Sequence, residues 1–298
     1  MKLSALLVCL LATASGLVSA QSTDYSRTLA SSLEKHRVVL RHFYTDSDLS
    51  FDSNGQLSSK GTEGFGPTDG TLLIQKVELK PDGLRISALH AVDMLSESGT
   101  AWTPTDLGSA VTVEVALPTG ESAETAVPQL LSTIFLKQSE LAGLACSAAE
   151  EQAFQDLIYG LKHHSSRNAK LPNAASLDQI QPFCLPNGEH AYKVERGIKA
   201  PRARHAPDPK YAEAARQNRL QGTVVLQCII TPGGNVSTIS IVRSMGATLR
   251  ADKRLQSAGF ELDARAVEGV SEWTFEPARF HDTPVPVVID VEVNFRLQ

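Results

Sequence analysis

The stretch TVVLQCIITPGGNVSTISIV, from Thr223 to Val242, decides the fold of the last third of this chain. It holds two runs rich in β-branched residues, Thr223–Ile230 and Val236–Val242, and such residues favour extended strands. Between them lies Thr231-Pro-Gly-Gly-Asn235, and Pro, Gly and Asn are the residues that tight turns need. The stretch therefore predicts a β-hairpin.

A helix is predicted on each side of this hairpin. Before it, Asp208 and Pro209 lead into an Ala- and Arg-rich run that stops at Gly222. Asp caps helix N-termini, Pro tolerates the first helical position, and Gly commonly ends a helix. After the hairpin, Asp263 is the expected N-cap of a second helix. Its apolar stripe at helical spacing consists of Leu262, Ala266, Val270 and Trp273.

The last residues show a strict alternation. The apolar set is Val287, Ile289, Val291, Val293, Phe295 and Leu297, and it alternates with Val288, Asp290, Glu292, Asn294 and Arg296. A period of two predicts a strand with one face on a core and one polar face. The order helix, hairpin, helix, strand predicts an α+β module with a small antiparallel sheet.

This order, with its particular residues, resembles the C-terminal domain of the TonB family. The residues that match the family pattern are Pro209, Tyr211, Ala215, Gly222, Gly234, Ser244, Leu262, Asp263, Ala266, Trp273, Phe275 and Pro277. There are three departures. Ala212 replaces the Pro that usually follows the Tyr, the link from Ser244 to Leu262 is longer than usual, and the front of the chain differs from a standard TonB.

The resemblance implies that the final strand is the edge of a three-stranded sheet and receives an extended segment from an outer-membrane TonB-dependent transporter. In such β-augmentation, main-chain hydrogen bonds supply affinity and alternate side chains supply selectivity. The expected partner-binding residues are Val287, Val288, Ile289, Asp290, Val291, Glu292, Val293, Asn294, Phe295 and Arg296. The charged residues among them can also keep the edge from aggregating, and both roles can hold together.

Two other functions stay open beside this non-enzymatic role in transmembrane transport. Exposed edges invite pairing, so an envelope interaction protein that forms a homodimer through its C-terminal strand is the main alternative. A secreted hydrolase with a site in the N-terminal sheet is the other. Against it, the chain has no G-x-S-x-G, H-E-x-x-H or G-x-x-x-x-G-K-[ST] motif. No catalytic residue, cofactor or metal site is predicted.

Residues 1–20 are predicted to be a signal peptide. Lys2 supplies the positive charge, Leu3–Ala12 the apolar segment, and Val18-Ser-Ala20 a small-residue cleavage site. Cleavage would place the protein in the periplasm of a Gram-negative-type bacterium. The alternative is an uncleaved anchor in the inner membrane with the chain facing the periplasm. Energy-transducing proteins of that membrane would then be partners.

Residues 21–161 are predicted to form an N-terminal α+β domain of unknown role, residues 162–197 a linker and residues 198–298 the C-terminal domain. The clearest N-terminal feature is a hairpin of Leu72–Leu79 and Leu84–Val92 around Lys80-Pro-Asp-Gly83. Further strands are expected at Leu49–Phe51 and Val111–Val115, and a short one around Tyr192–Ile198 is expected to belong to the C-terminal module. Helical stripes are formed by Leu29, Leu33, Leu40 and Phe43, and by Leu130, Ile134, Gln138 and Leu141.

Composition limits the remaining possibilities. With 42% hydrophobic and 20% charged residues, the 298-residue chain has the balance of a folded soluble protein. Its net charge of −5 argues against nucleic acid as a partner. Cys228 shares a strand face with the apolar residues Val224, Leu226 and Ile230 and is predicted to be a buried thiol. Cys146 and Cys184 could form a disulfide, worth roughly 4 kcal/mol on the chain-entropy model.

Overall fold

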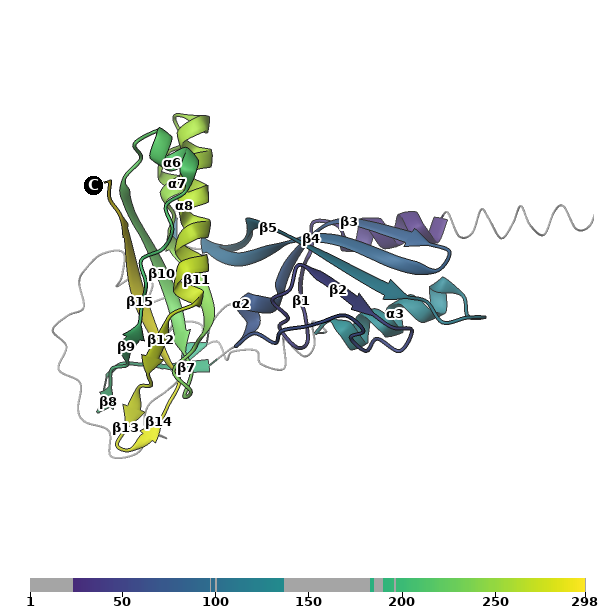
Figure 1. The fold of residues 1–298 in the computed structure, drawn as a ribbon, viewed down its shortest axis with the longest axis horizontal. Coiled ribbons are helices and arrows are strands. Elements are labelled where there is room, and N and C mark those ends of the chain that lie inside the picture. The colour runs from purple at the N-terminus through teal and green to yellow at the C-terminus, as the bar shows by residue number, and fades with distance from the viewer. Residues whose placement is uncertain are drawn as a thin grey trace, which may run out of the picture.

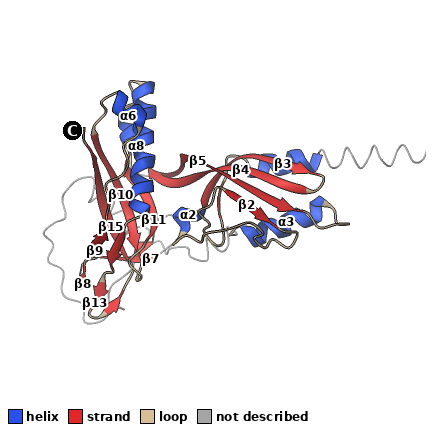
Figure 2. Cartoon of the chain, in the orientation of Figure 1, coloured by secondary structure: helices blue, strands red, loops and turns tan. Residues whose placement is uncertain are grey.

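A computed structural model of the chain describes residues 24–96, 98–99, 101–136, 183–184, 190–195 and 197–297. The predicted signal peptide, residues 1–20, and most of the predicted linker, residues 162–197, lie outside these ranges. In Figure 1 the C-terminal strands and the long helix α8 form an upright unit, and the N-terminal strands extend to one side of it. Helices and strands are mixed in both parts (Figure 2), which confirms the α+β class predicted from the sequence. Among the described helices, none is both long enough and apolar enough to span a membrane.

The N-terminal part is built around the predicted hairpin. Its two strands are β3 (Thr71–Lys80) and β4 (Gly83–Leu95), and they pair antiparallel. β5 (Trp102–Ala116) continues the sheet beyond β4, and β2 (Asp48–Phe51) pairs parallel with β5. The helix α3 (Ala123–Ile134) and the helix over residues 24–33 supply Val127, Leu130 and Leu29 to the core of this part.

The first predicted helical stripe is only partly correct. The helix over residues 24–33 stops before Lys35, whose φ of 66° is left-handed. The chain then forms β1 (Arg37–Val39), which pairs antiparallel with β3. Leu40 is therefore a buried residue after a strand and not part of a helix, because strand pairing overrides the local helical spacing. For the second stripe, Leu130 and Ile134 lie on α3 as predicted, and Gln138 and Leu141 lie outside the described residues.

The C-terminal part has the predicted hairpin and final strand. β10 (Gly222–Ile230) and β11 (Val236–Arg243) form the hairpin, and β15 (Val287–Phe295) pairs antiparallel with β10. The turn needs Gly234, whose φ is 87° and whose missing Cβ leaves room for the Phe275 carbonyl oxygen. The helix α8 (Lys253–Ser271) packs its apolar side on this sheet, burying Leu262, Ala266 and Val270.

Both predicted helix starts in this part are wrong. The first helix is the short α6 (Glu213–Gln217), which begins after Ala212 and not after Asp208. The second helix begins at Lys253, and its N-cap is Asp252, which accepts hydrogen bonds from the backbone N–H groups of Arg254 and Leu255. Asp263 lies in the middle of α8 and is buried. An Asp inside one helix can cap a neighbouring helix, as Asp263 does. Residue type alone does not distinguish such an Asp from the N-cap of its own helix.

Short elements complete the C-terminal part. They are β6 (Phe183–Cys184), β7 (His190–Lys193), β8 (Ile198–Lys199), β9 (Arg202–His205), α7 (Met245–Thr248), β12 (Thr274–Glu276), β13 (Arg279–Phe280) and β14 (Thr283–Pro284). β9 pairs with β12, and β8 with β13. The strand expected around Tyr192–Ile198 thus occurs as β7 and β8, and both pair with C-terminal strands.

The two parts share one sheet, a feature that the sequence did not predict. β4 pairs parallel with β11 at Asp93–Ser240 and Met94–Ile241. The resulting ten-stranded sheet runs β1-β3-β4-β11-β10-β15-β7-β6, with β5 and β2 branching from β4. Apolar contacts also join the two parts. Val92 of β4 is buried in the C-terminal core, and Leu107 of β5 packs against this core.

Candidate functional site

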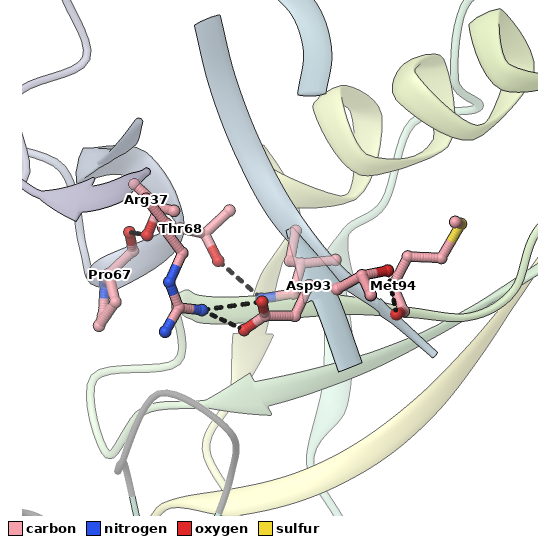
Figure 3. Close-up of polar contacts among 8 residues, drawn as sticks. Arg37, Pro67, Thr68, Asp93 and Met94 are labelled. Carbon is pink, nitrogen blue, oxygen red and sulfur yellow. Dashed lines mark hydrogen bonds and ion pairs between the residues drawn. The ribbon is translucent and has the colours of Figure 1, made fainter. Parts of the chain in front are cut away.

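One edge of the C-terminal sheet is closed by the N-terminal part of the chain. Beside the β4–β11 pairing, the four-residue helix α2 (Pro67–Gly70) lies against β11, and the Thr68 hydroxyl accepts a hydrogen bond from the Ile239 N–H at 2.7 Å. Figure 3 shows this junction, with Arg37 holding the carboxylate of Asp93 beside it. Gly66 lies so close to Ser237 that a Cβ on Gly66 would come within 2.5 Å of the Ser237 carbonyl oxygen. The β11 edge is therefore blocked to a partner.

The opposite edge of these strands, along β15, is largely open among the described residues. On its inner side β15 pairs with β10 over its full length, from Gly222–Phe295 to Ile230–Val287. On its outer side, β7 pairs with β15 only at Val287 and Val288. From Ile289 to Phe295, no other described strand pairs with the outer side of β15. We call this stretch, Ile289–Phe295, the open edge.

The backbone groups that face outward can be assigned from one hydrogen bond. The Tyr192 N–H of β7 donates to the Pro286 carbonyl at 3.0 Å, so the Pro286 backbone faces outward. Backbone groups alternate sides along a strand, and the β10–β15 register has no bulge. Asp290, Glu292 and Asn294 therefore direct their N–H and C=O groups to the open edge. These are the groups that an added strand would use.

The side chains of the open edge divide between two faces. Val291, Val293 and Phe295 are buried on the side of α8, where Phe295 packs edge-on against Tyr211 at a ring distance of 5.4 Å. Asp290, Glu292 and Asn294 are exposed on the other side. Of the ten predicted partner-binding residues, Val287 and Val288 are already paired on both sides, Ile289–Phe295 make up the open edge, and Arg296 lies after the strand.

The twelve residues that carried the family resemblance lie outside the open edge, in the helices, turns and strands that support it. Pro209 packs on Gly269 of α8, where a Cβ would meet the Pro209 ring at 2.7 Å. The Tyr211 hydroxyl donates to the Leu220 carbonyl, and the Trp273 indole N–H donates to the Pro207 carbonyl at 3.0 Å. The fully or almost fully buried members are Ala215, Ser244, Leu262, Asp263, Ala266 and Phe275. Gly222 opens β10, Gly234 forms the turn, and Pro277 follows β12.

Ser244 and Asp263 form the most buried polar contact of this scaffold. The Asp263 carboxylate accepts hydrogen bonds from the Ser244 hydroxyl at 2.5 Å and from the backbone N–H groups of Met245 and Gly246 at 2.7 and 3.2 Å. Burial raises the pKa of Asp263 to about 6, although these three donors lower it. The carboxylate thus caps α7 from within α8 and fixes the link between β11 and α8.

The cysteine predictions are confirmed at one position. Cys228 is a free thiol with no exposed surface, as predicted, and burial raises its pKa. Cys146 lies outside the described residues, and only the backbone of Cys184 is described, so their pairing stays a prediction. Among the described residues, no group of three or more His, Cys, Asp or Glu side chains is arranged to hold a metal ion.

The sequence pointed to the open edge but not to the residues that limit it. The alternation of β15 made the strand and its polar face predictable. Tyr192 and Lys193 pair with the first two residues of β15, Val287 and Val288, and were predicted only as part of a short strand. Nothing in the local pattern of Arg37, Thr68 or Asp93 marks them as residues that close the β11 edge, because pairing between distant strands has no local signature.

Comparisons with known proteins agree with this arrangement. Residues 207–252 match the family described as Gram-negative bacterial TonB protein C-terminal. Protein tonB2 of Pseudomonas aeruginosa is 29% identical over 93 residues, which cover 31% of this chain and 30% of that protein. Protein TonB of Neisseria meningitidis serogroup C is 32% identical over 94 residues, covering 26% of this chain and 34% of that protein. The chain thus spans about a third of the length of these curated relatives. With the hairpin, α8 and β15 arranged as described, the C-terminal part of this chain is a TonB C-terminal domain.

Proposed function

We propose that this chain is a non-enzymatic, TonB-type protein of the periplasm that binds an outer-membrane TonB-dependent transporter by strand addition at β15. The observation that carries the proposal is the open edge, Ile289–Phe295, in a domain whose other edge is closed. Main-chain groups of Asp290, Glu292 and Asn294 would bond to an extended segment of the transporter, as in β-augmentation generally. The similarity to TonB proteins supports the choice of partner.

The closed β11 edge strengthens this proposal because, of the two outer strands of the set β11-β10-β15, it leaves β15 as the one with an open edge among the described residues. A free three-stranded sheet has two edges, and either can recruit a second copy or a partner. Here β4 and α2 occupy the β11 edge. A partner that adds a strand beside β11, β10 and β15 therefore meets β15 and not β11.

The test uses the isotope-labelled chain and a synthetic peptide with the sequence of a transporter segment that lies before its plug. We expect the amide resonances of Ile289–Phe295 to shift on addition of the peptide, and those of Ile239 and Ile241 to stay in place. An unchanged spectrum of the open edge at high peptide concentration would contradict the proposal.

Proline variants separate strand addition from other modes of binding. Glu292→Pro removes an outward N–H, which edge strands tolerate, and should abolish peptide binding while the fold is kept. Glu292→Ala keeps the backbone donor and should still bind. Val291→Pro removes an inward N–H of the β10–β15 ladder and should destabilise the domain. If Glu292→Pro folds and binds like the unchanged chain, backbone pairing at this edge is not the mode of binding.

A homodimer through the same edge is the second candidate, because an open edge can also pair with its own copy. The two candidates differ in what the peptide does. A dimer that dissociates on peptide addition supports transporter binding with self-pairing as a resting state. A dimer that persists, with no shift of the open-edge amides, supports the structural function.

A further inference from the structure

The open edge is bounded at one end by β7, and this sets where an added segment can lie. β7 occupies the outer side of β15 at Val287 and Val288, and its last residue, Lys193, lies opposite Val288. A further segment must therefore lie beyond Lys193, along Ile289–Phe295. At 3.3 Å per residue this stretch is roughly 23 Å long and pairs with about seven residues.

An added segment would present alternate side chains to two unlike surfaces. On the side of α8 its residues would lie beside Ile289, Val291 and Val293, which are apolar. On the other side its residues would lie beside Asp290 and Glu292. Cross-strand neighbours on one face contact each other directly. The charges of Asp290 and Glu292 therefore act on the side chains of the added segment that lie on their face.

The two carboxylates on that face form no close ion pair with a described residue. Neither Asp290 nor Glu292 forms an ion pair with any described residue within 4.0 Å. Desolvation by the sheet raises the pKa of Asp290 to about 6, and repulsion from Glu292 adds to this, while Gln227 and Lys193 lower it. Because Asp290 is exposed, water limits the size of the effect.

A buried amide next to Asp290 has unused hydrogen-bonding capacity. Gln227 of β10 is cross-strand neighbour to Asp290 and has only 1% of its surface exposed. Among the described residues, its side-chain oxygen and nitrogen have no hydrogen-bond partner of good geometry. The amide is near enough to favour the charged form of Asp290, yet it leaves hydrogen-bonding capacity unused, and unused capacity in buried groups is unfavourable.

The chain itself shows what kind of side chain suits this face. β7 is the one described strand on the outer side of β15, and it places Lys193 where the positive charge lowers the pKa of Asp290. A segment that continues along the same edge would meet Asp290 and Glu292 next.

We propose that the open edge selects an extended segment with apolar and basic residues in alternation, whose Lys or Arg side chains lie over Asp290 and Glu292. This inference rests on the proposed function and adds the chemistry of the partner segment. Main-chain bonds hold the segment, and the charges set its register: a shift by one residue would turn its basic side chains toward Val291 and Val293.

The competing explanation of the same charges is that they only prevent edge-to-edge aggregation. In that case any extended segment with suitable apolar residues would bind equally well, whatever its charge. The two explanations differ in a measurable preference between matched peptides.

The test uses the full chain and three synthetic peptides of about seven residues, with Val at alternate positions and Lys, Gln or Glu at the others. Affinity is measured from the amide shifts of Ile289–Phe295 at low salt. We expect the Lys peptide to bind at least about tenfold more tightly than the Glu peptide, since opposite charges across a strand pair are favourable and like charges unfavourable. The double variant Asp290→Lys/Glu292→Lys should reverse this order, and Asp290→Asn/Glu292→Gln should remove it.

Each outcome decides one of the two proposals. Equal affinity for the Lys and Glu peptides overturns charge selection and leaves strand addition intact. A Lys preference that survives in Asp290→Lys/Glu292→Lys also overturns it, because the peptide is then held elsewhere. If the transporter-derived peptide shifts the open edge and the Lys peptide does not, the inference fails alone. If no peptide shifts these amides, the proposed function fails with it.

Discussion

The guanidinium of Arg37 donates two hydrogen bonds to the carboxylate of Asp93, at 2.8 and 2.6 Å, directly beside the point where β4 joins β11. Asp93 is cross-strand neighbour to Ser240, so this ion pair fixes the end of β4 at the junction of the two parts. Its side chains are 27% and 10% exposed, which limits screening by water.

We expect Arg37→Ala to lower the free energy of unfolding by roughly 1–3 kcal/mol, because Asp93 is then left as a largely buried charge without a partner. Urea denaturation measures this change. The matched control is Lys76→Ala, which breaks an exposed pair with Glu78 and should change stability much less than Arg37→Ala does. Equal effects of the two variants would contradict the assigned role of Arg37.

Thr68→Val should loosen the β11 edge without unfolding the domain. Val has the shape of Thr but no hydroxyl, so the Ile239 N–H loses its acceptor. Hydrogen exchange of the Ile239 amide should accelerate by roughly fivefold to tenfold, which corresponds to about 1 kcal/mol for one hydrogen bond. Thr68→Ser keeps the hydroxyl and should exchange like the unchanged chain. Equal rates for Val and Ser at this position would show that the hydroxyl is not the acceptor.

Asp263→Ala should be far more destabilising than Asp252→Ala, although both carboxylates cap helices. Asp263 is 2% exposed, and its loss leaves the Met245 and Gly246 N–H groups buried without an acceptor. We expect a loss of roughly 3 kcal/mol or more for Asp263→Ala. Asp252 is an exposed N-cap, and its loss should remove about 1 kcal/mol. Thermal unfolding of the two variants provides the comparison.

The stability of the chain should depend on pH through Asp263. Its pKa rises from an ordinary value of 3.8 to about 6 in the folded state. Between these values the folded state binds more protons than the unfolded state, so stability falls as pH rises from about 4 to about 6 and then levels off. The fall attributable to Asp263 is roughly 3 kcal/mol, because each tenfold change in a proton-binding constant corresponds to about 1.4 kcal/mol. Asp263→Ala should lack this part of the slope, and identical pH profiles for both chains would show that another group causes it.

Local sequence patterns predicted the strands correctly where one face of the strand packs on a core. The alternation from Val287 to Phe295 predicted β15, and the Pro-Gly-Gly-Asn turn predicted the hairpin of β10 and β11. The helix starts failed because Asp208 and Asp263 are both typical N-cap residues, and residue type alone does not say which helix, if any, a carboxylate caps.

Residue patterns alone predicted a TonB-like module with a polar-faced final strand as the candidate binding edge. Which edges are open follows from the folded arrangement, because strand pairing depends on residues far apart in the chain. Asp93 pairs with Ser240, and Lys193 pairs with Val288, through backbone hydrogen bonds that every residue type except Pro can form. Such bonds leave no pattern in the sequence. They close the β11 edge, and within the part of the chain that the structure describes no strand pairs with the outer side of β15 from Ile289 to Phe295.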